Sequence, residues 1–295
     1  MAITLGANQY GKAEVRLVTV SRTGPVHAIR DLTISTSLRG DLADTHLTGD
    51  NAKVVPTDTQ KNTVYALARQ EPVGQVEEFA LRLARHFVDN HEHITGARVS
   101  VAEHGWDRIT VNGTPHDHAF SRSSDERRTA VATVDDRGTR VVSGLSDLVV
   151  LKSTGSEFHG FAKDRYTTLP ETTDRILATA VTATWRHGSP TLSTKDWDAS
   201  FTSARTAILA AFADTHSLSL QQTLFAMGRA VLEAEQGITE IRLVLPNKHH
   251  FAVDLSPFGL DNDNEVFHAA DRPYGLIEGT VVRDGTDDGD PRDEW

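Results

Sequence analysis

The sequence predicts an α+β protein in which helices cover one face of antiparallel sheets. Two patterns support this fold class. Alternating apolar and polar residues mark strands, whereas apolar residues three or four positions apart mark helices. The same order of two strands, two helices and two strands occurs twice along the chain. We therefore expect two domains of similar construction at residues 1–139 and 140–283, followed by an acidic tail at 284–295.

The first copy opens with a strand, because Ala13, Val15 and Leu17 alternate with charged residues. A helix is expected to begin at Thr57, since Thr57 and Gln60 have the spacing of a capping box. Capping, worth about 1 kcal/mol, is therefore the simplest role for Thr57. The other elements expected here are a strand at 28–38, a helix with Phe79, Leu83 and Phe87 on one face, and strands near 97–102 and 128–134.

The second copy follows Gly138. Its second helix is expected to open at Ser219, with Gln222 at the position that completes a capping box. Residues 246–250 (PNKHH) interrupt an otherwise apolar strand and therefore predict a surface turn. The other elements expected are strands near 145–152 and 176–185, a helix with Phe201, Ala204, Ile208 and Phe212 in one stripe, and closing strands around 241–245 and 277–281.

Each copy is expected to leave part of its sheet uncovered. Four strands and two helices cannot cover both faces of a sheet or close it into a barrel. Open edges and an uncovered face favour association with further chains. The sequence therefore predicts a homo-oligomer.

The composition excludes several classes of protein. The chain has no cysteine, which excludes disulfides, zinc–thiolate sites and cysteine nucleophiles. Its net charge of −11 disfavours nonspecific nucleic-acid binding, and no run of about 20 apolar residues could span a membrane. The first residues do not resemble a secretory signal, and the last three (DEW) are not a peroxisomal address. We expect a cytoplasmic enzyme that binds neither nucleic acid nor membrane, with a disordered acidic tail.

Histidine is the first residue type to consider for a metal site. The chain has 14 histidines, among them the pairs His91 and His93, His116 and His118, and His249 and His250. None of the pairs falls in a helical His-Glu-x-x-His pattern, and His-x-His is also common as a polar surface pair on strands. A metal site is therefore the less favoured interpretation.

The first turns of two predicted helices suggest an anion site. Free backbone N–H groups at a helix start attract anions, so Thr57 and Asp58 could present donors to an anionic ligand. Gln221 stands in the equivalent turn of the later helix. Taken singly, three further candidates are typical of surface charges or core side chains: Lys12, Arg175 and Phe158.

Six separated segments carry a resemblance to a known family. They are residues 8–12 (NQYGK), 57–65 (TDTQKNTVY), 151–161 (LKSTGSEFHGF), 166–177 (YTTLPETTDRIL), 245–251 (LPNKHHF) and 273–277 (PYGLI). From about residue 8 to residue 282 the chain is similar to urate oxidases, so only the acidic tail lies outside the resemblance. The resemblance implies tandem tunnelling-fold domains, with four chains in a barrel-like homotetramer.

The reaction implied by the resemblance is a step of purine degradation. Urate, dioxygen and water give 5-hydroxyisourate and hydrogen peroxide, with no cofactor. Urate itself is the reductant, so neither metal nor flavin is expected. The protein then needs only to orient the urate anion, stabilise it and move protons.

The resemblance also assigns roles to individual residues. It implies a proton relay of Lys12, Thr57 and His249, in which Lys12 contacts the threonine hydroxyl and His249 contacts Lys12 from the other side. Arg175 is expected to grip the pyrimidine edge of urate as a bidentate donor. Gln221 is expected to bind an adjacent carbonyl and N–H.

The remaining roles complete a site between chains. By the resemblance, Phe158 stacks on the purine, and Leu220 contributes its backbone at the ring edge. Asn247 lies above the ring and holds water or dioxygen. Thr57 and Asp58 come from a neighbouring chain, so the oligomer is part of the catalyst.

Two departures and two alternatives accompany this interpretation. His250 stands where relatives often have tyrosine, and Leu220 where valine also occurs; neither puts the reaction in doubt. One alternative is a metal-dependent pterin or guanine-nucleotide enzyme of related fold, with His116, His118 and other residues as ligands, although the lack of cysteine counts against its zinc–thiolate forms. The other is a noncatalytic purine-binding module, against which the joint presence of the relay residues argues.

Overall fold

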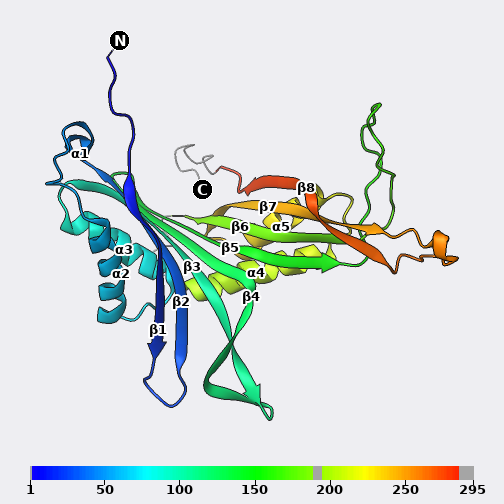
Figure 1. The fold of residues 1–295 in the computed structure, drawn as a ribbon, viewed down its shortest axis with the longest axis horizontal. Helices are drawn as coiled ribbons and strands as arrows, with labels where there is room; N and C mark the ends of the chain where they lie inside the picture. Colours follow the sequence, from blue (N-terminus) through cyan, green and yellow to red (C-terminus); the bar gives the residue numbers. More distant parts are fainter. Residues whose placement is uncertain (1, 189–194, 286–295) are drawn as a thin grey trace. The chain divides into compact units, whose positions relative to one another are not determined.

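The computed structural model describes residues 2–188 and 195–285, so the predicted acidic tail lies outside the described residues except at its first two positions. In chain order (Figure 1) the elements are β1 (Tyr10–Ser21), β2 (Ala28–Gly40), α1 (Ala43–Leu47), α2 (Thr57–Gln70), α3 (Val76–Asn90), β3 (Ile94–Val111), β4 (Thr114–Asp135), β5 (Gly138–Lys152), β6 (Leu177–His187), α4 (Trp197–Asp214), α5 (Leu220–Ala234), β7 (Ile238–Ala252), a 3-10 turn (Ser256–Phe258) and β8 (Phe267–Val282). Apart from the short α1 and the 3-10 turn, this is the predicted order of elements. The α+β class is confirmed.

The chain divides into two compact units. Unit 1 comprises Met1–Gly144 and Arg186–Asp198, and unit 2 comprises Leu145–Trp185 and Ala199–Trp295. Strand β5 begins in unit 1 and continues in unit 2. The chain therefore enters unit 2 within β5, returns to unit 1 at the last two residues of β6, and enters unit 2 again within α4.

In unit 1, strands β1 to β4 form a sheet in which each strand is antiparallel to the next. Helix α2 packs against β1, and α3 packs against β3 and β4 (Figure 1). The predicted apolar stripe of α3, Phe79, Leu83 and Phe87, is fully buried together with Leu32 and Ile34 of β2. Burial of each large apolar side chain contributes about 1.5–3 kcal/mol, so this layer between helices and sheet is the core of unit 1.

Unit 2 has a core of its own. Strands β7 and β8 pair antiparallel, and α5 packs against both. Trp185 of β6, Met227 of α5 and Leu243 of β7 are fully buried, and the predicted stripe of α4 packs into the same core. A Cβ atom at Gly228 would lie 2.6 Å from Val281 Cγ2, so glycine is what allows α5 to lie this close to β8.

Candidate active site

Lys12 lies near the start of β1 and is half-buried. Its backbone N–H donates to Thr36 Oγ1 of β2 over 3.3 Å, and a β-bulge follows it, because the register with β2 shifts between Lys12 and Val15. The pKa of the Asp58 carboxyl is lowered, first by a hydrogen bond from Lys61 and, as a smaller contribution, by the charge of Lys12. Lys12 therefore lies within electrostatic reach of the first turn of α2.

Thr57 does not cap α2, so the predicted capping box is wrong. Pro56 occupies the N-cap position without a side-chain cap hydrogen bond, and Thr57 is the first helical residue. Gln60 is fully buried, and its amide accepts from Thr36 Oγ1 at 2.6 Å and donates to the Val55 carbonyl at 3.2 Å. The Thr57 side chain is exposed, and its hydroxyl has no hydrogen-bond partner within residues 2–188 and 195–285. It is available to a ligand or to another chain.

Asp58 follows Thr57 in the exposed first turn of α2. Its carboxylate forms an ion pair with Lys61 and accepts a hydrogen bond of 3.0 Å from Asn62 Nδ2. A negative charge in the first turn of a helix also interacts favourably with the helix dipole. Unit 1 thus places Thr57 and Asp58 in the first turn of α2, where the charge of Lys12 reaches Asp58.

A short antiparallel bridge holds Phe158 beside Arg175 in unit 2. Phe158 and Thr172 exchange two backbone hydrogen bonds of 2.8 and 3.0 Å, and the Arg175 N–H donates to the Ser156 carbonyl at 2.8 Å. The guanidinium carbon of Arg175 lies 5.2 Å from the centroid of the Phe158 ring, within the range of a cation–π contact. Buried Ser156 also accepts from Arg175 Nε at 3.4 Å, which orients the guanidinium.

The terminal nitrogens of Arg175 are available to a ligand. The side chain is half-buried, and this burial lowers the pKa of Arg175. In the described part of the chain neither Nη atom has a hydrogen-bond partner, and no carboxylate pairs with the guanidinium. The adjacent Asp174 instead accepts a hydrogen bond from Thr154 Oγ1 at 2.9 Å. Two unused, coplanar donors suit a planar ligand that presents two acceptors.

The start of α5 places Leu220 and Gln221. Ser219 caps this helix as predicted, since its Oγ accepts from the Gln222 N–H at 3.2 Å. The second half of the predicted box is shifted by one residue, because Gln222 Oε1 accepts from the Leu218 N–H at 2.8 Å. Leu220 is buried, whereas Gln221 is exposed and its amide has no partner among the described residues.

Asn247 and His249 lie in β7, so the predicted surface turn at 246–250 is wrong. The strand continues to Ala252, and both residues are half-buried. By strand alternation they share the face of Leu245, which is buried in the core with α5. The register with β8 shifts between Asn247 and His249, with several extra residues on β8. Residues 246–250 therefore form an irregular part of the β7–β8 pairing and not a turn.

His249 is favoured in its neutral form. Burial lowers the pKa of His249, and the charges of Arg175 and His250 lower it further. The His249 ring also stacks on Phe251, with 5.6 Å between centroids. Because the charge of Arg175 reaches His249, these two residues and Phe158 occupy the same region of unit 2.

The candidate residues therefore fall into two groups, one in each unit. Unit 2 carries Phe158, Arg175, Leu220, Gln221, Asn247 and His249, whereas the other three are in unit 1. The sequence assigns no role to Ser156 and the wrong role to Gln60; in the structure these residues hold Arg175 and the start of α2 in place. Both are polar residues within the segments that carry the family resemblance, and both are buried in the structure. Because a buried polar group needs a hydrogen-bond partner, their burial indicates a structural role.

Two other expectations concern metals and membranes. The His116 and His118 rings lie 4.6 Å apart, but no group of three or more His, Asp or Glu side chains among the described residues is arranged to hold a metal ion. In residues 2–188 and 195–285 no helix is long and apolar enough to cross a membrane. The cytoplasmic location stays a prediction.

Comparison with known proteins identifies the family. The family model described as Uricase matches residues 8–133 and 141–278. The chain is 56% identical to the uricase of Arthrobacter globiformis over 96% of this chain and 91% of that protein, and 41% identical to the uricase of Dictyostelium discoideum over 95% and 98%. A crystal structure of the Arthrobacter globiformis uricase superposes with a TM-score of 0.94 at 55% identity and covers 99% of both chains. The chain therefore belongs to the uricase family.

Proposed function

We propose that this protein oxidises urate with dioxygen and water to 5-hydroxyisourate and hydrogen peroxide. Membership of the uricase family supports the reaction. The observation in the chain itself that carries the proposal is the half-buried Arg175 guanidinium, with its unused terminal nitrogens beside the ring of Phe158. Urate is a flat anion with carbonyl groups on its edge, so it matches both features.

In the proposed complex, Arg175 donates two hydrogen bonds to the pyrimidine edge of urate, and Phe158 stacks on the ring. Gln221 binds an adjacent carbonyl and N–H through its unpartnered amide, while Leu220 contributes its backbone at the ring edge. These contacts orient the substrate and favour its anion. Specificity for a planar purine follows from the stacking and from the paired donors.

The oxidation transfers two electrons from urate to dioxygen, and the oxygen of water becomes the new hydroxyl group. The proposed relay of Lys12, Thr57 and His249 moves the protons that accompany this transfer. Neutral His249 is suited to accept a proton, and the Thr57 hydroxyl can both donate and accept. Asn247 holds the attacking water or dioxygen above the ring. No metal or flavin takes part in the proposed reaction.

We infer that each active site combines unit 1 of one chain with unit 2 of a neighbouring chain. The relay needs residues from both units, and Lys12 accompanies Thr57 because both belong to unit 1. The exposed Thr57 hydroxyl, which has no hydrogen-bond partner among the described residues of its own chain, supports this arrangement. Homotetramer formation is then a requirement for activity.

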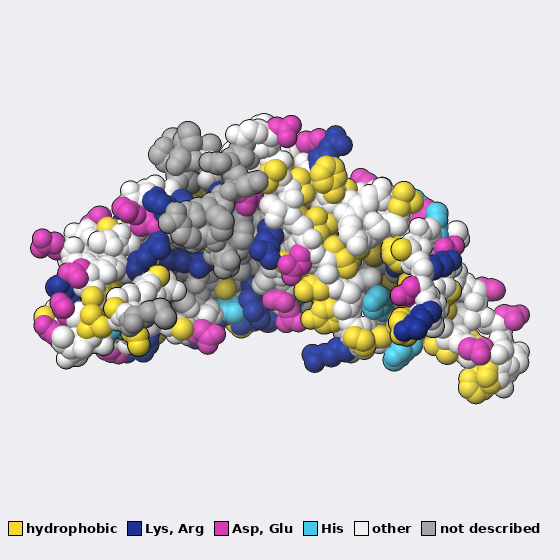
Figure 2. Space-filling model, turned by 90° about the horizontal axis from the view of Figure 1, so that it is seen from above, with side chains coloured by type: hydrophobic (Ala, Val, Ile, Leu, Met, Phe, Trp, Pro, Cys, Tyr) yellow, Lys and Arg dark blue, Asp and Glu magenta, His cyan; other side chains and the backbone are white. Residues whose placement is uncertain are grey.

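Exposed apolar side chains support such an assembly. In unit 2, Val149, Leu151 and Leu276 are more than half exposed. They alternate along β5 and β8 with Leu148 and Ile277, which pack in the core, so they lie on the sheet face away from the helices. Figure 2 shows hydrophobic side chains gathered at the surface on one face of the molecule. Contiguous exposed apolar surface is typical of an interface between chains.

The pH dependence of the reaction follows from the lowered pKa of His249. If neutral His249 accepts a proton, activity is lost as the pH falls through that lowered pKa, so the acidic limb of kcat/KM lies below about pH 6.5, the ordinary value for histidine. Replacing His250 with phenylalanine removes one of the charges that lower the pKa of His249, so the acidic limb should move to higher pH. A pH–rate profile of both proteins checks this. A limb that stays in place in His250→Phe would contradict the assignment.

The experiment that tests the function is loss of the urate ultraviolet band with chelator-treated protein, with oxygen uptake and peroxide release followed together. We expect rapid loss, with one dioxygen consumed and one peroxide formed per urate. Loss only after added metal would favour the metal-dependent alternative. Binding of urate without any loss would favour a noncatalytic purine-binding module.

A further inference from the structure

A regular β1 would point Lys12 away from α2. Side chains alternate between the two faces of a strand, and Val15 and Leu17 are buried in the core that includes Val64 of α2. Regular alternation would place Lys12, three residues before Val15, on the opposite face. The interval from Lys12 to Val15 on β1 pairs with the shorter interval from Thr36 to Ile34 on β2, so β1 contains one extra residue. The bulge returns Lys12 to the helix-covered face.

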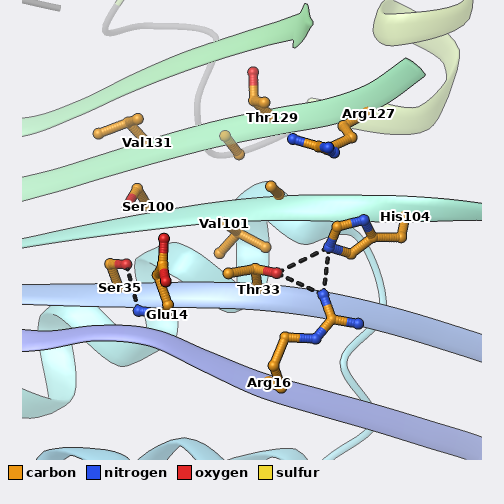
Figure 3. A pocket seen from close by; sticks show the side chains of 12 residues that line it. Glu14, Arg16, Thr33, Ser35, Ser100, Val101, His104, Arg127, Thr129 and Val131 are labelled. Carbon is orange, nitrogen blue, oxygen red and sulfur yellow. Dashed lines mark hydrogen bonds between the residues drawn. The ribbon is translucent and has the colours of Figure 1, made fainter. Parts of the chain in front are cut away.

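Glu14 lies within this bulge, between Lys12 and Val15. Its φ is +58°, in the left-handed region that residues other than glycine seldom adopt, so neighbouring groups must hold it there. Ser35 Oγ accepts its backbone N–H at 2.9 Å. Figure 3 shows Glu14 and Ser35 in a pocket that Thr33 also lines. Thr33 and Ser35 alternate with buried Ile34, so this pocket is on the face away from the helices.

Thr36 holds the other side of the bulge. A Cβ atom at Gly11 would lie 1.7 Å from the Thr36 carbonyl oxygen, so only glycine permits the two strands to approach this closely. Thr36 Oγ1 accepts the Lys12 N–H at 3.3 Å and donates its own proton to Gln60 Oε1 at 2.6 Å. The hydroxyl thus connects the backbone of Lys12 to helix α2.

Gln60 completes the connection to the start of α2. Its side chain is fully buried, and Nε2 donates to the Val55 carbonyl at 3.2 Å, just before the helix. Gln60 is one turn after Thr57 in the same helix. Three hydrogen bonds therefore link the backbone of Lys12 to the segment that presents Thr57.

We propose that Thr36 and Gln60 are positioning residues that hold Lys12 against Thr57 by tying the β1 bulge to the first turn of α2. The inference rests on the proposed function, which places Lys12 and Thr57 in the relay. Thr36 and Gln60 are buried and act through Lys12 without touching urate. Replacing Thr36 or Gln60 should lower kcat and leave urate binding unchanged, because Arg175 and Phe158 still bind urate when a relay group is out of position.

Two substitutions at residue 36 separate the role of its hydroxyl from that of its shape. The site requires a hydroxyl that accepts from Lys12 N–H and donates to Gln60. Valine has the shape of threonine but can do neither, whereas serine can do both. Thr36→Val should therefore lower kcat at least about tenfold, because small displacements of catalytic groups cost up to about 100-fold. Thr36→Ser should restore most of it, and the KM for urate should change little in both.

The matched control is Thr33→Val, the same change on the same strand. Thr33 Oγ1 hydrogen-bonds Arg16 and His104 on the other face of the sheet (Figure 3), so the change leaves the hydrogen bonds of Thr36 intact. Thr33→Val should keep the wild-type kcat. Gln60→Met, which removes both side-chain hydrogen bonds at similar volume, is the second test variant in case Thr36→Val does not fold.

A double variant separates positioning from a general structural effect. In a Lys12→Met background, Thr36→Val should cause no further loss of kcat, because the group that it positions is gone. A crystal structure of Thr36→Val should show the bulge altered and Lys12 moved from Thr57. Three results would each overturn the inference. The first is an unaltered bulge in Thr36→Val, and the second is wild-type kcat in both Thr36→Val and Gln60→Met. The third is a loss of kcat on Thr36→Val in the Lys12→Met background equal to the loss in the wild-type background. Wild-type protein that does not oxidise urate would instead refute the proposed function, and the crystal structure would still test the positioning.

Discussion

Replacing Lys12 with methionine is expected to lower kcat for urate about 100-fold to 10,000-fold, the range that a positioned proton-transfer group contributes. Methionine keeps an unbranched side chain but holds no exchangeable proton. Lys12 is half-buried near the start of β1, outside the core, so the fold should persist. Binding should also persist, because Arg175, Phe158 and Gln221 belong to unit 2. Steady-state kinetics and anaerobic urate binding measure the two effects separately.

The control for this change is Lys53→Met. Lys53 belongs to the same unit and pairs with Asp41 and Asp44 at the surface. Its loss should leave kcat and KM unchanged. A Lys12→Met protein as active as wild type would remove the relay from the mechanism.

Replacing Arg175 with glutamine is expected to raise the KM for urate at least about 30-fold. Hydrogen bonds to charged groups contribute about 1.5–3 kcal/mol each, and the variant loses the guanidinium that makes two of them. Glutamine keeps a polar side chain of moderate length, so the half-buried position remains occupied. Equilibrium binding of urate without oxygen measures the loss directly.

Arg242→Gln is the matched change at a position outside the site. Arg242 lies in β7 of the same unit and pairs with Glu278 across the strands. Its loss should leave urate binding unchanged. Wild-type affinity in Arg175→Gln would show that urate is held elsewhere.

Much of the fold could be predicted from the sequence because the apolar periodicity is regular. The stripe of Phe79, Leu83 and Phe87 in α3 is buried as expected, and Ser219 caps α5. Local patterns of this kind depend only on residues within one element. The return to unit 1 at the end of β6 and the start of α4 depends on tertiary packing, for which no local pattern exists.

The two wrong predictions, the capping box at Thr57 and the turn at 246–250, occur where tertiary contacts override local sequence preferences. Gln60 has the spacing of a capping residue, but Thr36 and Val55 take its hydrogen bonds. Residues 246–250 have the composition of a turn, yet they form a strand whose ladder with β8 is irregular. In each case the deviation lies beside a candidate site residue, Thr57 or His249. Local rules often fail at functional sites, because such sites accept strain or irregularity.

The candidate residues themselves were found through long motifs and not through their chemistry. Lys12, Phe158 and Arg175 carry no distinguishing pattern singly. Their physical reasons for function, such as the unused nitrogens of Arg175 and the bulge beside Lys12, become visible only in three dimensions.

The central claim is that each active site joins two chains, and mixed oligomers of two inactive variants test it most directly. Lys12→Met damages unit 1 and Arg175→Gln damages unit 2, so the two variants are co-expressed with different tags and the mixed oligomers are purified. If sites form between chains, random mixing yields about one undamaged site in four, with a KM for urate equal to that of wild type. If each site lies within a single chain, every site stays damaged. Activity no higher than that of the separate variants would contradict the proposed arrangement.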